Sequence, residues 1–533
     1  MKTQLFPLII ALTGILSCQT SAKKPPDLVA SRDTTISVAN SYNELFFDSL
    51  QLENFIAREK LHDSMALAMR NFYNKRNYQY AWFFKDGMAD YAGTFLNQQN
   101  DYMNYSGDSS IYNVVLQTSL DSLSDTASYN PPDSLKLKTE FLLTRQFFRY
   151  ASRAYAGRRD INAKDLGWYI PRKKIDAVGL LDSLLQNKGT NLSQYEPLNR
   201  QYGLLKDYLL KYYDAQKKGD WQPIVVRKNS YKPGDSSITI LQIKKRLLLT
   251  GDLTTNDTNV FFTDSLVAAI KRYQHRNGLT EDGIAGPALF AELNRPISDR
   301  INQILINMER IRWVPAEPNS DFLLVNIPEF RLHVYENGKY KWNMKVVVGA
   351  VAHNTVIFNG NLKYIVFSPY WNVPPSIIKK EIVPGMRRNK NYLANHNMEW
   401  NNGAVRQKPG PANSLGLVKF LFPNSYNIYF HDTPSKNLFN ESKRAFSHGC
   451  IRLGEPKKLA EYLLRNDPNW NDASITKAMK SGKEKYVTLK QTVPVFIGYF
   501  TAWVDQDGKL NFRDDIYGHD KEMADHLFAT SKK

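Results

Sequence analysis

Cys450 is the residue of this chain best suited to covalent chemistry. It lies in the run Ser447-His448-Gly449-Cys450-Ile451-Arg452, downstream of His431, and it is one of two cysteines in 533 residues. A thiol reacts as its thiolate, and a nearby imidazole can accept its proton or stabilise its charge. The pattern therefore predicts a cysteine nucleophile for acyl transfer. The alternative is a buried cysteine acting as a small apolar residue, and its polar and glycine neighbours argue against that.

The second cysteine has a different explanation, which comes from the N-terminus. Residues 1–17 carry an early lysine and an apolar stretch too short to span a bilayer, as in a secretory signal. Ile15-Leu16-Ser17 before Cys18 resembles the lipobox of bacterial lipoproteins, in which the cysteine is lipidated. An ordinary cleaved signal is the alternative. We expect Cys18 to be the lipid attachment, residues 18–42 to be a tether, and Cys450 to have no disulfide partner within the chain.

The composition points to an anionic partner. The net charge is +18, and the length predicts three or four domains. An exported protein without a recognition motif is a poor candidate for nucleic acid, so none is expected as a partner. Anionic envelope polymers and stem peptides with free carboxylates fit the charge better. A merely solvated basic surface is the alternative.

The chain before the nucleophile divides into two predicted helical parts. Helical periodicity over 43–225 predicts a helical scaffold domain without a catalytic constellation. Residues 236–296 resemble the three-helix peptidoglycan-binding module through Leu241-Gln242, Asn277-Gly278-Leu279 and the loop 282–287. Gly283 and Gly286 permit a tight turn with positive φ before a helix that begins at a proline. A structural bundle that has lost ligand binding is the alternative.

Residues 300–506 are expected to form the next domain, in which short β-rich runs begin at about Phe322 and Asn337-Gly338 is a hairpin signal. A long polar segment at about 375–417 predicts a lid, helical from Pro375 to Met386. Residues 507–533 are expected to form a C-terminal tail. The fold class predicted for the whole chain is multidomain α+β: a helical scaffold, a three-helix module, and a mostly-β catalytic domain with a partly helical lid.

The catalytic segment resembles the L,D-transpeptidase family, whose signature is a histidine followed by Ser/Thr-x-Gly-Cys-Ile/Val-Arg. The match is His431-Asp432-Thr433-Pro434 with Ser447 to Arg452. The likeness extends to the long, multidomain, YcbB-like branch through four further segments: 307–313, 325–328, 369–376 and 419–424. Members of that branch carry a scaffold, a binding module and a catalytic domain with a capping loop. One departure is Thr355-Val356, where the family often has Thr-Pro, and it affects the shape of a loop.

The resemblance implies a role for each residue of the motif. Cys450 attacks the amide between the third residue of a stem tetrapeptide, typically diaminopimelate, and its terminal D-alanine, and a thioester forms. His431 transfers protons, with its other ring nitrogen held by the carbonyl of Asp432, and His448 is the second candidate for the base. The backbone N–H groups of His448, Gly449 and Cys450 are candidates for the oxyanion hole.

Four side chains have two interpretations each. Arg452 either orients a substrate carboxylate or pins the loop through a buried ion pair, and Ser447 either contacts substrate or only hydrogen-bonds the turn. Tyr429 and Trp371 either line the acyl-donor pocket or belong to the core. A zinc site built on Cys450 and the two histidines lacks further ligands, so no metal and no other cofactor is expected.

The sequence therefore predicts an L,D-transpeptidase that joins diaminopimelate residues between neighbouring glycan strands. It is expected in the cell envelope, facing the periplasm and held at a membrane by lipid, with peptidoglycan stem peptides and glycan strands as partners. An L,D-carboxypeptidase or endopeptidase would use the same thioester and resolve it with water. A non-catalytic peptidoglycan-binding scaffold is the alternative from another class of protein.

Overall fold

A computed structural model describes residues 29–125, 131–190, 196–315 and 318–528. The predicted signal peptide, Cys18 and the first part of the tether lie outside the described residues. Within those ranges, none of the helices has the length and apolar character needed to cross a membrane. The chain divides into two compact units, the first formed by residues up to Ala89 with Thr118–Arg145 and the second by Asp90–Gln117 with the chain from Gln146 onward.

The first unit is built on helices and one short hairpin. Its elements are α1 (Ser49–Arg58), α2 (Asp63–Asn74), β1 (Phe83–Phe84), β2 (Gly87–Met88), the end of α4 (Val114–Asp125) and the start of α5 (Asp133–Ala156). The carboxylate of Glu140 is fully buried and accepts the backbone N–H groups of Ala81 at 2.7 Å and Trp82 at 2.9 Å. Burial raises the pKa of Glu140 to about 7. These bonds tie α5 to the segment before the hairpin.

The second unit contains the remaining scaffold helices and the helix that leads into the catalytic domain. They are α3 (Asp90–Ser106), α6 (Ala177–Gln186), α7 (Arg200–Lys218) and α11 (Ile297–Trp313), with a 3₁₀ turn, η1 (Ser109–Ile111). On α11, the buried guanidinium of Arg312 pairs with Glu309 at 2.7 Å and donates to the hydroxyl of Tyr202 on α7 at 2.6 Å. A buried pair of this kind holds only while both charges stay hydrogen-bonded, and here it fixes α7 against α11.

The three-helix module has a hydrophobic core of its own. It consists of α8 (Ile238–Leu249), α9 (Asp264–Arg276) and α10 (Pro287–Leu293). Gly283 has the expected positive φ of +75°, and a Cβ there would lie 2.8 Å from the side chain of Val267. Gly286 differs from the expectation, because its φ is −102° in extended backbone. Gly286 acts as the N-cap of α10, with Pro287 at the first helical position.

The catalytic domain is a closed β-barrel. Its strands are β3 (Phe322–Asn326), β4 (Arg331–Glu336), β5 (Lys339–Gly349), β6 (Phe358–Phe367), β10 (Val418–Leu421), β11 (Phe430–His431), β12 (Ala445–Ser447), β13 (Ile451–Leu453) and β14 (Lys485–Gly498). They are ordered β12-β5-β13-β11-β10-β6-β14-β3-β4, and β4 also pairs with β5. That last pairing closes the sheet. The turn between β4 and β5 is the predicted one, with positive φ at Asn337 and Gly338.

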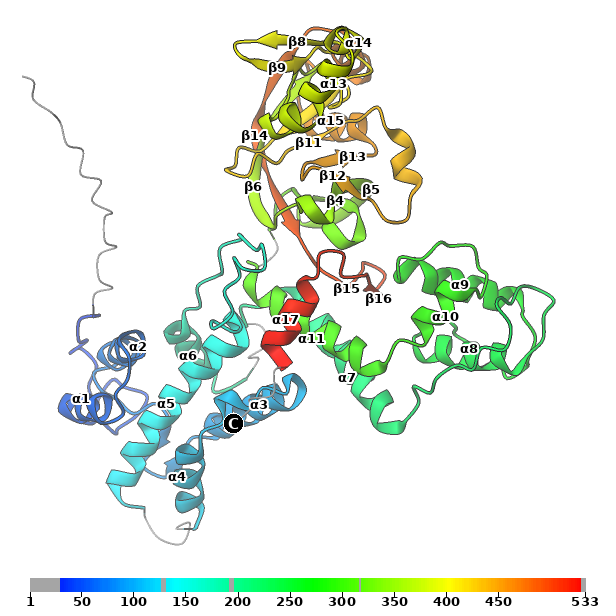
Figure 1. Cartoon of the computed structure of the whole chain (residues 1–533). Coiled ribbons are helices and arrows are strands. Elements are labelled where there is room, and N and C mark those ends of the chain that lie inside the picture. The colour runs from blue at the N-terminus through cyan, green and yellow to red at the C-terminus, as the bar shows by residue number, and fades with distance from the viewer. Residues whose placement is uncertain (1–28, 126–130, 191–195, 316–317, 529–533) are drawn as a thin grey trace, which may run out of the picture. The chain divides into compact units, whose positions relative to one another are not determined.

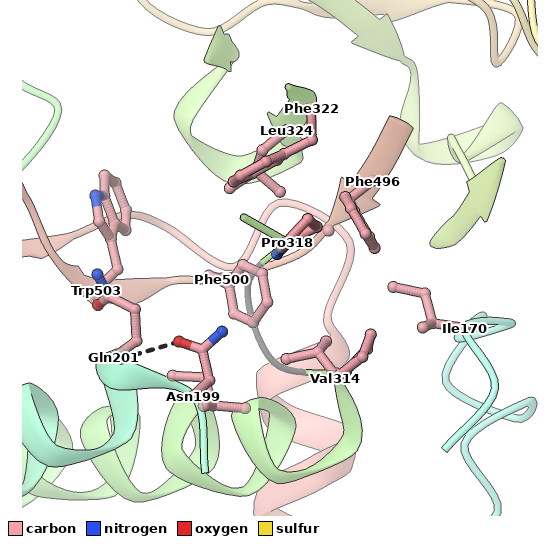
Figure 2. Close-up of a pocket in the computed structure, with 13 residues that line it drawn as sticks. Ile170, Asn199, Gln201, Val314, Pro318, Phe322, Leu324, Phe496, Phe500 and Trp503 are labelled. Atoms are coloured by element: carbon pink, nitrogen blue, oxygen red, sulfur yellow. Dashed lines mark hydrogen bonds between the residues drawn. The ribbon is translucent and has the colours of Figure 1, made fainter. Parts of the chain in front are cut away.

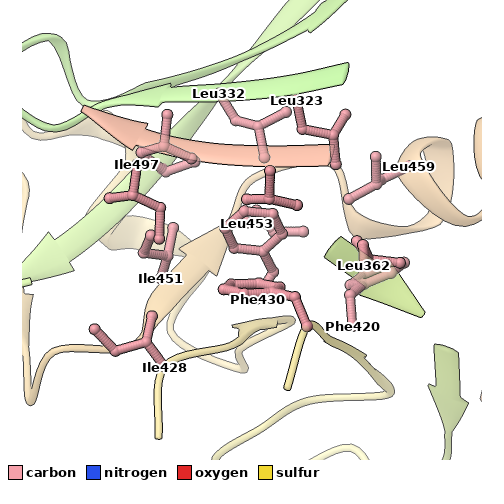
Figure 3. Packing of buried hydrophobic residues seen from close by; sticks show 14 of the residues in the cluster. Leu323, Leu332, Leu362, Phe420, Ile428, Phe430, Ile451, Leu453, Leu459 and Ile497 are labelled. Atoms are coloured by element: carbon pink, nitrogen blue, oxygen red, sulfur yellow. The ribbon is translucent and has the colours of Figure 1, made fainter. Parts of the chain in front are cut away.

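The barrel interior is filled by alternate residues of these strands. Figure 3 shows Phe420, Phe430, Ile451 and Leu453 pointing into one cluster with residues of β3, β4 and β14. Leu459 and Ile475 complete the cluster from two helices, α15 (Pro456–Leu464) and α16 (Asp472–Met479). Side chains alternate along a strand, so the residues between the buried ones must point out of the barrel.

The lid is a small folded subdomain (Figure 1). Its elements are β7 (Trp371–Asn372), α12 (Pro375–Ile377), a π-helical turn η5 (Ile378–Ile382), α13 (Val383–Arg388), α14 (Tyr392–Asn395), β8 (Met398–Asn401) and β9 (Ala404–Gln407). The helical part agrees with the prediction, whereas the three-stranded sheet β7-β9-β8 was not expected, because its strands have only two to four residues. Val373, Ile377, Ile382 and Val405 form its core.

The C-terminal segment is part of the folded catalytic domain. It forms β15 (Ala502–Val504), β16 (Leu510–Phe512) and α17 (His519–Phe528). Met523 of α17 is fully buried in the same cluster as the barrel residues. The fold therefore continues past the expected boundary at residue 506. Short 3₁₀ turns complete the domain: η3 (Ile327–Glu329), η4 (Val351–His353) and η6 (Lys436–Asn440).

Candidate active site

Cys450 and His431 come from neighbouring parallel strands. Phe430 pairs with Ile451 and His431 with Arg452, and the Ile451 N–H donates to the carbonyl of Tyr429 at 3.2 Å. Phe430 and Ile451 point into the barrel (Figure 3). The residues before and after each of them therefore share the outer face. This places Cys450 and His431 as diagonal neighbours on one face, with Tyr429 and Arg452 beside them.

One hydrogen bond fixes the tautomer of His431. Its Nδ1 lies 2.5 Å from the backbone carbonyl oxygen of Asp432. A carbonyl can only accept, so Nδ1 carries the proton and Nε2 keeps a lone pair. Burial, followed by the positive charge of Arg452, lowers the pKa of His431 to about 3. His431 is therefore a neutral base with its free nitrogen available for proton transfer.

The side chain of Asp432 holds this carbonyl in place. Its carboxylate accepts the backbone N–H groups of Leu417 at 2.9 Å and Thr433 at 2.7 Å, and it pairs with Lys436. Gly416 has a positive φ of +62°, and a Cβ there would lie 2.4 Å from the Asp432 carboxylate. The glycine is required for this close approach. Asp432 thus supports His431 through the backbone.

The thiol of Cys450 is neutral at rest. Its Sγ lies 3.5 Å from the carbonyl oxygen of Asn427, to which the thiol proton is donated. Burial raises the pKa of Cys450, and hydrogen bonds from Tyr429 and the charge of Arg452 counteract only part of that rise. The ring of Tyr429 also lies 5.7 Å from that of His431. The resting pair is therefore thiol and imidazole, which differs from a preformed thiolate–imidazolium pair.

This charge state predicts how Cys450 responds to pH. Iodoacetamide reacts with the thiolate, so alkylation of Cys450 should rise tenfold per pH unit through pH 7–9, with a midpoint above the ordinary thiol value. The measurement is the pH profile of alkylation, followed by the mass of the Cys450 peptide. A rate that is already on a plateau at pH 6 would contradict the assignment, because a thiolate–imidazolium pair gives that result.

The turn that carries the nucleophile is held by two hydroxyl groups. Gly449 has a φ of +108°. The buried Ser447 hydroxyl donates to the Cys450 carbonyl at 2.5 Å and accepts the Gly449 N–H at 3.2 Å. Thr355 donates to the Gly449 carbonyl at 2.8 Å and accepts the Gly349 N–H at 2.9 Å. The Gly449 N–H is thus already engaged, so the Cys450 N–H is the better candidate for an oxyanion donor.

Replacing Thr355 by valine should destabilise this turn. Thr355 is fully buried, and the change leaves the Gly349 N–H and the Gly449 carbonyl without a partner, which costs about 1–3 kcal/mol in the free energy of unfolding. Thr355→Ser keeps the hydroxyl and should lose much less. Denaturant titration of the two variants measures the difference. Equal stability of Thr355→Val and wild type would show that these bonds do not hold the turn.

Two of the predicted site residues lie at the lid. The His448 side chain is 54% exposed, and its Nε2 lies 3.8 Å from the Glu381 carboxylate of the lid. Its ring is 5.1 Å from that of His353. Trp371 lies in β7 and packs against the core of the lid. Neither contact involves the Cys450 sulfur.

Lys419 is a residue near the site that the sequence analysis missed. It pairs with His431 across β10 and β11, and its neighbours Val418 and Phe420 are buried in the barrel. The one indication in the sequence was that this lysine stands between two apolar residues of a strand. Its relation to His431 depends on the register of two strands, which the sequence alone does not give. The side chain of Lys419 is only 11% exposed, and burial lowers its pKa.

An apolar pocket of about 100 Å³ lies apart from these residues (Figure 2). Val314 at the end of α11, Phe322 and Leu324 of β3, Phe496 of β14 and Trp503 of β15 line it, and none of the predicted site residues does. Among the described residues, no three His, Cys, Asp or Glu side chains are grouped so that they could hold a metal ion.

Comparisons with known proteins match three parts of the chain. Residues 320–477 match the family model of the L,D-transpeptidase catalytic domain, YkuD, and 239–293 that of a putative peptidoglycan binding domain. Residues 67–209 match a scaffold domain. A putative L,D-transpeptidase of Haemophilus influenzae is 31% identical over 281 residues, which are 49% of this chain and 56% of that protein. The match thus spans little more than half of the curated relative's length.

Solved structures similar to this chain include two L,D-transpeptidases. One, from Mycobacterium smegmatis, is 12% identical over 34% of this chain and 60% of that one, with a TM-score of 0.20. The other, from Stackebrandtia nassauensis, is 15% identical, and the match covers 52% of this chain and 98% of that one, with a TM-score of 0.22. From the family matches and the curated relative, the chain carries a YkuD L,D-transpeptidase catalytic domain together with a peptidoglycan-binding domain. The predicted YkuD-type catalytic domain, the predicted peptidoglycan-binding module and the predicted fold class are confirmed.

Proposed function

We propose that this protein is an L,D-transpeptidase that joins stem peptides of peptidoglycan through a thioester on Cys450. The observation that carries the proposal is the hydrogen bond from His431 Nδ1 to the Asp432 carbonyl. This bond leaves the Nε2 lone pair free. His431 lies on the same face of the sheet as Cys450. Because Nε2 carries no proton, it can accept the thiol proton during attack.

In the first half of the reaction, Cys450 Sγ attacks the carbonyl carbon of the amide between diaminopimelate and the terminal D-alanine. The S–C bond forms while the thiol proton passes to His431 Nε2. The tetrahedral intermediate then collapses, the C–N bond breaks, and His431 returns the proton to the leaving nitrogen. D-alanine departs as a free amino acid, and the acyl group remains on sulfur as a thioester.

In the second half, an amine of a neighbouring stem peptide attacks the thioester carbonyl. His431 Nε2 takes a proton from this amine and gives it to sulfur as the S–C bond breaks. The products are a new amide cross-link and the original thiol. The amine proposed is the side-chain amine of a second diaminopimelate, which gives a link between neighbouring glycan strands.

Three groups stabilise charge during these steps. The Cys450 backbone N–H is the proposed oxyanion donor, and removing one such donor typically costs about 3 kcal/mol of transition-state stabilisation. The guanidinium of Arg452 has a buried Nε without a hydrogen-bond partner. Among the described residues, no carboxylate lies within ion-pair distance of Arg452, so its charge is free to stabilise the thiolate. Hydrogen bonding with Tyr429 lowers the pKa of Cys450 and so favours the thiolate.

Other parts of the chain support proposals for how substrate is bound and where the enzyme acts. We propose that residues 236–296 hold the enzyme on glycan strands and that the positive net charge favours this anionic polymer. Ser447 supports the turn, and His448 and Trp371 belong to the contacts of the lid. Lipid on Cys18 would keep the enzyme at a membrane, facing the periplasm.

Product analysis separates transfer from hydrolysis. Purified protein is incubated with tetrapeptide muropeptides, and the products are weighed by mass spectrometry. A dimer that lacks one D-alanine is the expected product. Tripeptide without dimer would mean that water resolves the thioester and that the protein is an L,D-carboxypeptidase. No change of any muropeptide, with binding to sacculi intact, would support the non-catalytic scaffold.

A further inference from the structure

Lys419 and Arg452 flank His431 on two sides in one row across the barrel. Lys419 on β10 pairs with His431 on β11, and His431 pairs with Arg452 on β13. Phe420 and Phe430, the next residues along β10 and β11, point into the core (Figure 3). Lys419 and His431 therefore share the outer face with Cys450. Adjacent strands lie about 4.8 Å apart, so the backbones of Lys419 and Arg452 lie about 10 Å apart on either side of His431.

Lys419 is only partly neutralised by its surroundings. Among the described residues, its one carboxylate neighbour is Glu484, with 3.8 Å between Nζ and Oε1. That distance is longer than a hydrogen bond. The same carboxylate oxygen already accepts the backbone N–H of Tyr370 at 2.9 Å. A cation that is largely shielded from water and incompletely paired is ready to bind an anion.

The proposed reaction places an anion at this position. His431 must reach the nitrogen of the leaving residue, because it returns the proton there. The carboxylate of that residue is two bonds beyond this nitrogen. Cys450, His431 and Lys419 follow one another across the neighbouring strands β13, β11 and β10. In the acyl donor, the carbonyl carbon, the amide nitrogen and the carboxylate follow one another in the same order, so each donor group has one of these residues as its counterpart.

We propose that Lys419 binds the terminal carboxylate of the acyl donor and thereby restricts the enzyme to cleavage of the last residue of a stem peptide. This assignment rests on the proposed function. In a donor that is one residue longer, the corresponding carboxyl group is part of a neutral amide. Such a donor loses the charge contact and places further atoms against the Lys419 side chain.

The first test measures the charge at the site without transpeptidation. Iodoacetate and iodoacetamide differ by one carboxylate, and the ratio of their rates at Cys450 cancels any change in thiol pKa or access. The ratio should fall about tenfold in Lys419→Met at low salt and stay near the wild-type value in Lys419→Arg. Thermal unfolding of each variant confirms that it is folded. An unchanged ratio in Lys419→Met would overturn the inference.

The second test uses the acyl donor itself. Wild-type kcat/KM is compared for a tetrapeptide donor with a free terminal carboxylate and for its terminal amide. The preference for the carboxylate should drop at least tenfold in Lys419→Met. An equal loss on both donors would overturn the carboxylate contact and leave Lys419 as a group that only positions His431. A changed alkylation ratio without product from wild type would instead contradict the proposed function.

Discussion

Replacing Cys450 by alanine should abolish formation of cross-linked muropeptides. The variant lacks the thiol, so no thioester can form at this position, and the loss of a nucleophile in such a site costs on the order of 10⁴–10⁶ in kcat. The measurement is the rate of dimer formation from tetrapeptide muropeptides. Because residues 236–296 have a separate core, binding to sacculi should be unchanged. Dimer formation by Cys450→Ala at the wild-type rate would remove Cys450 from the mechanism.

Replacing His431 by alanine should lower the rate of acylation by a tetrapeptide donor about 10²–10⁴-fold, the usual contribution of a general base. The residue supplies the free Nε2 that accepts the thiol proton. Release of D-alanine in a single turnover measures the acylation step. The pKa of about 3 also predicts that this step shows no inflection near pH 6.5 in wild type.

His448 provides the matched control for this prediction. It lies two residues before the nucleophile, yet its ring faces His353 and the lid carboxylate of Glu381. His448→Ala should therefore change acylation less than about fivefold. If His448→Ala caused the larger loss, the base would have been assigned to the wrong histidine.

Much of the fold could be predicted from local patterns. The module at 236–296 was visible because its loop glycines and proline have fixed backbone roles, of which Gly283 has the predicted positive φ and Gly286 does not. The lid helices were visible at Pro375. The lid sheet could not be predicted, since Met398–Asn401 and Ala404–Gln407 are short and are stabilised by pairing with each other and with β7. The packing of α17 into the barrel depends on tertiary contacts, among them that of Met523.

The site could be predicted only in part, because some of its residues depend on tertiary contacts. Cys450 and His431 stand out by residue type and spacing, whereas Lys419 and Thr355 act through strand register and loop contacts. Even within the motif, the sequence alone did not decide the role of Ser447. Its position beside the nucleophile suggested two roles, and the hydrogen bonds to Cys450 and Gly449 place it in the turn.

The most direct test of the mechanism is to trap the acyl-enzyme. Wild-type protein is mixed with a tetrapeptide donor, quenched in acid within one turnover, digested, and weighed peptide by peptide. The Cys450 peptide should gain the mass of the donor minus D-alanine, and treatment with hydroxylamine should remove that mass. Cross-linked product formed while the Cys450 peptide stays unmodified at every quench time would contradict a covalent route through this cysteine.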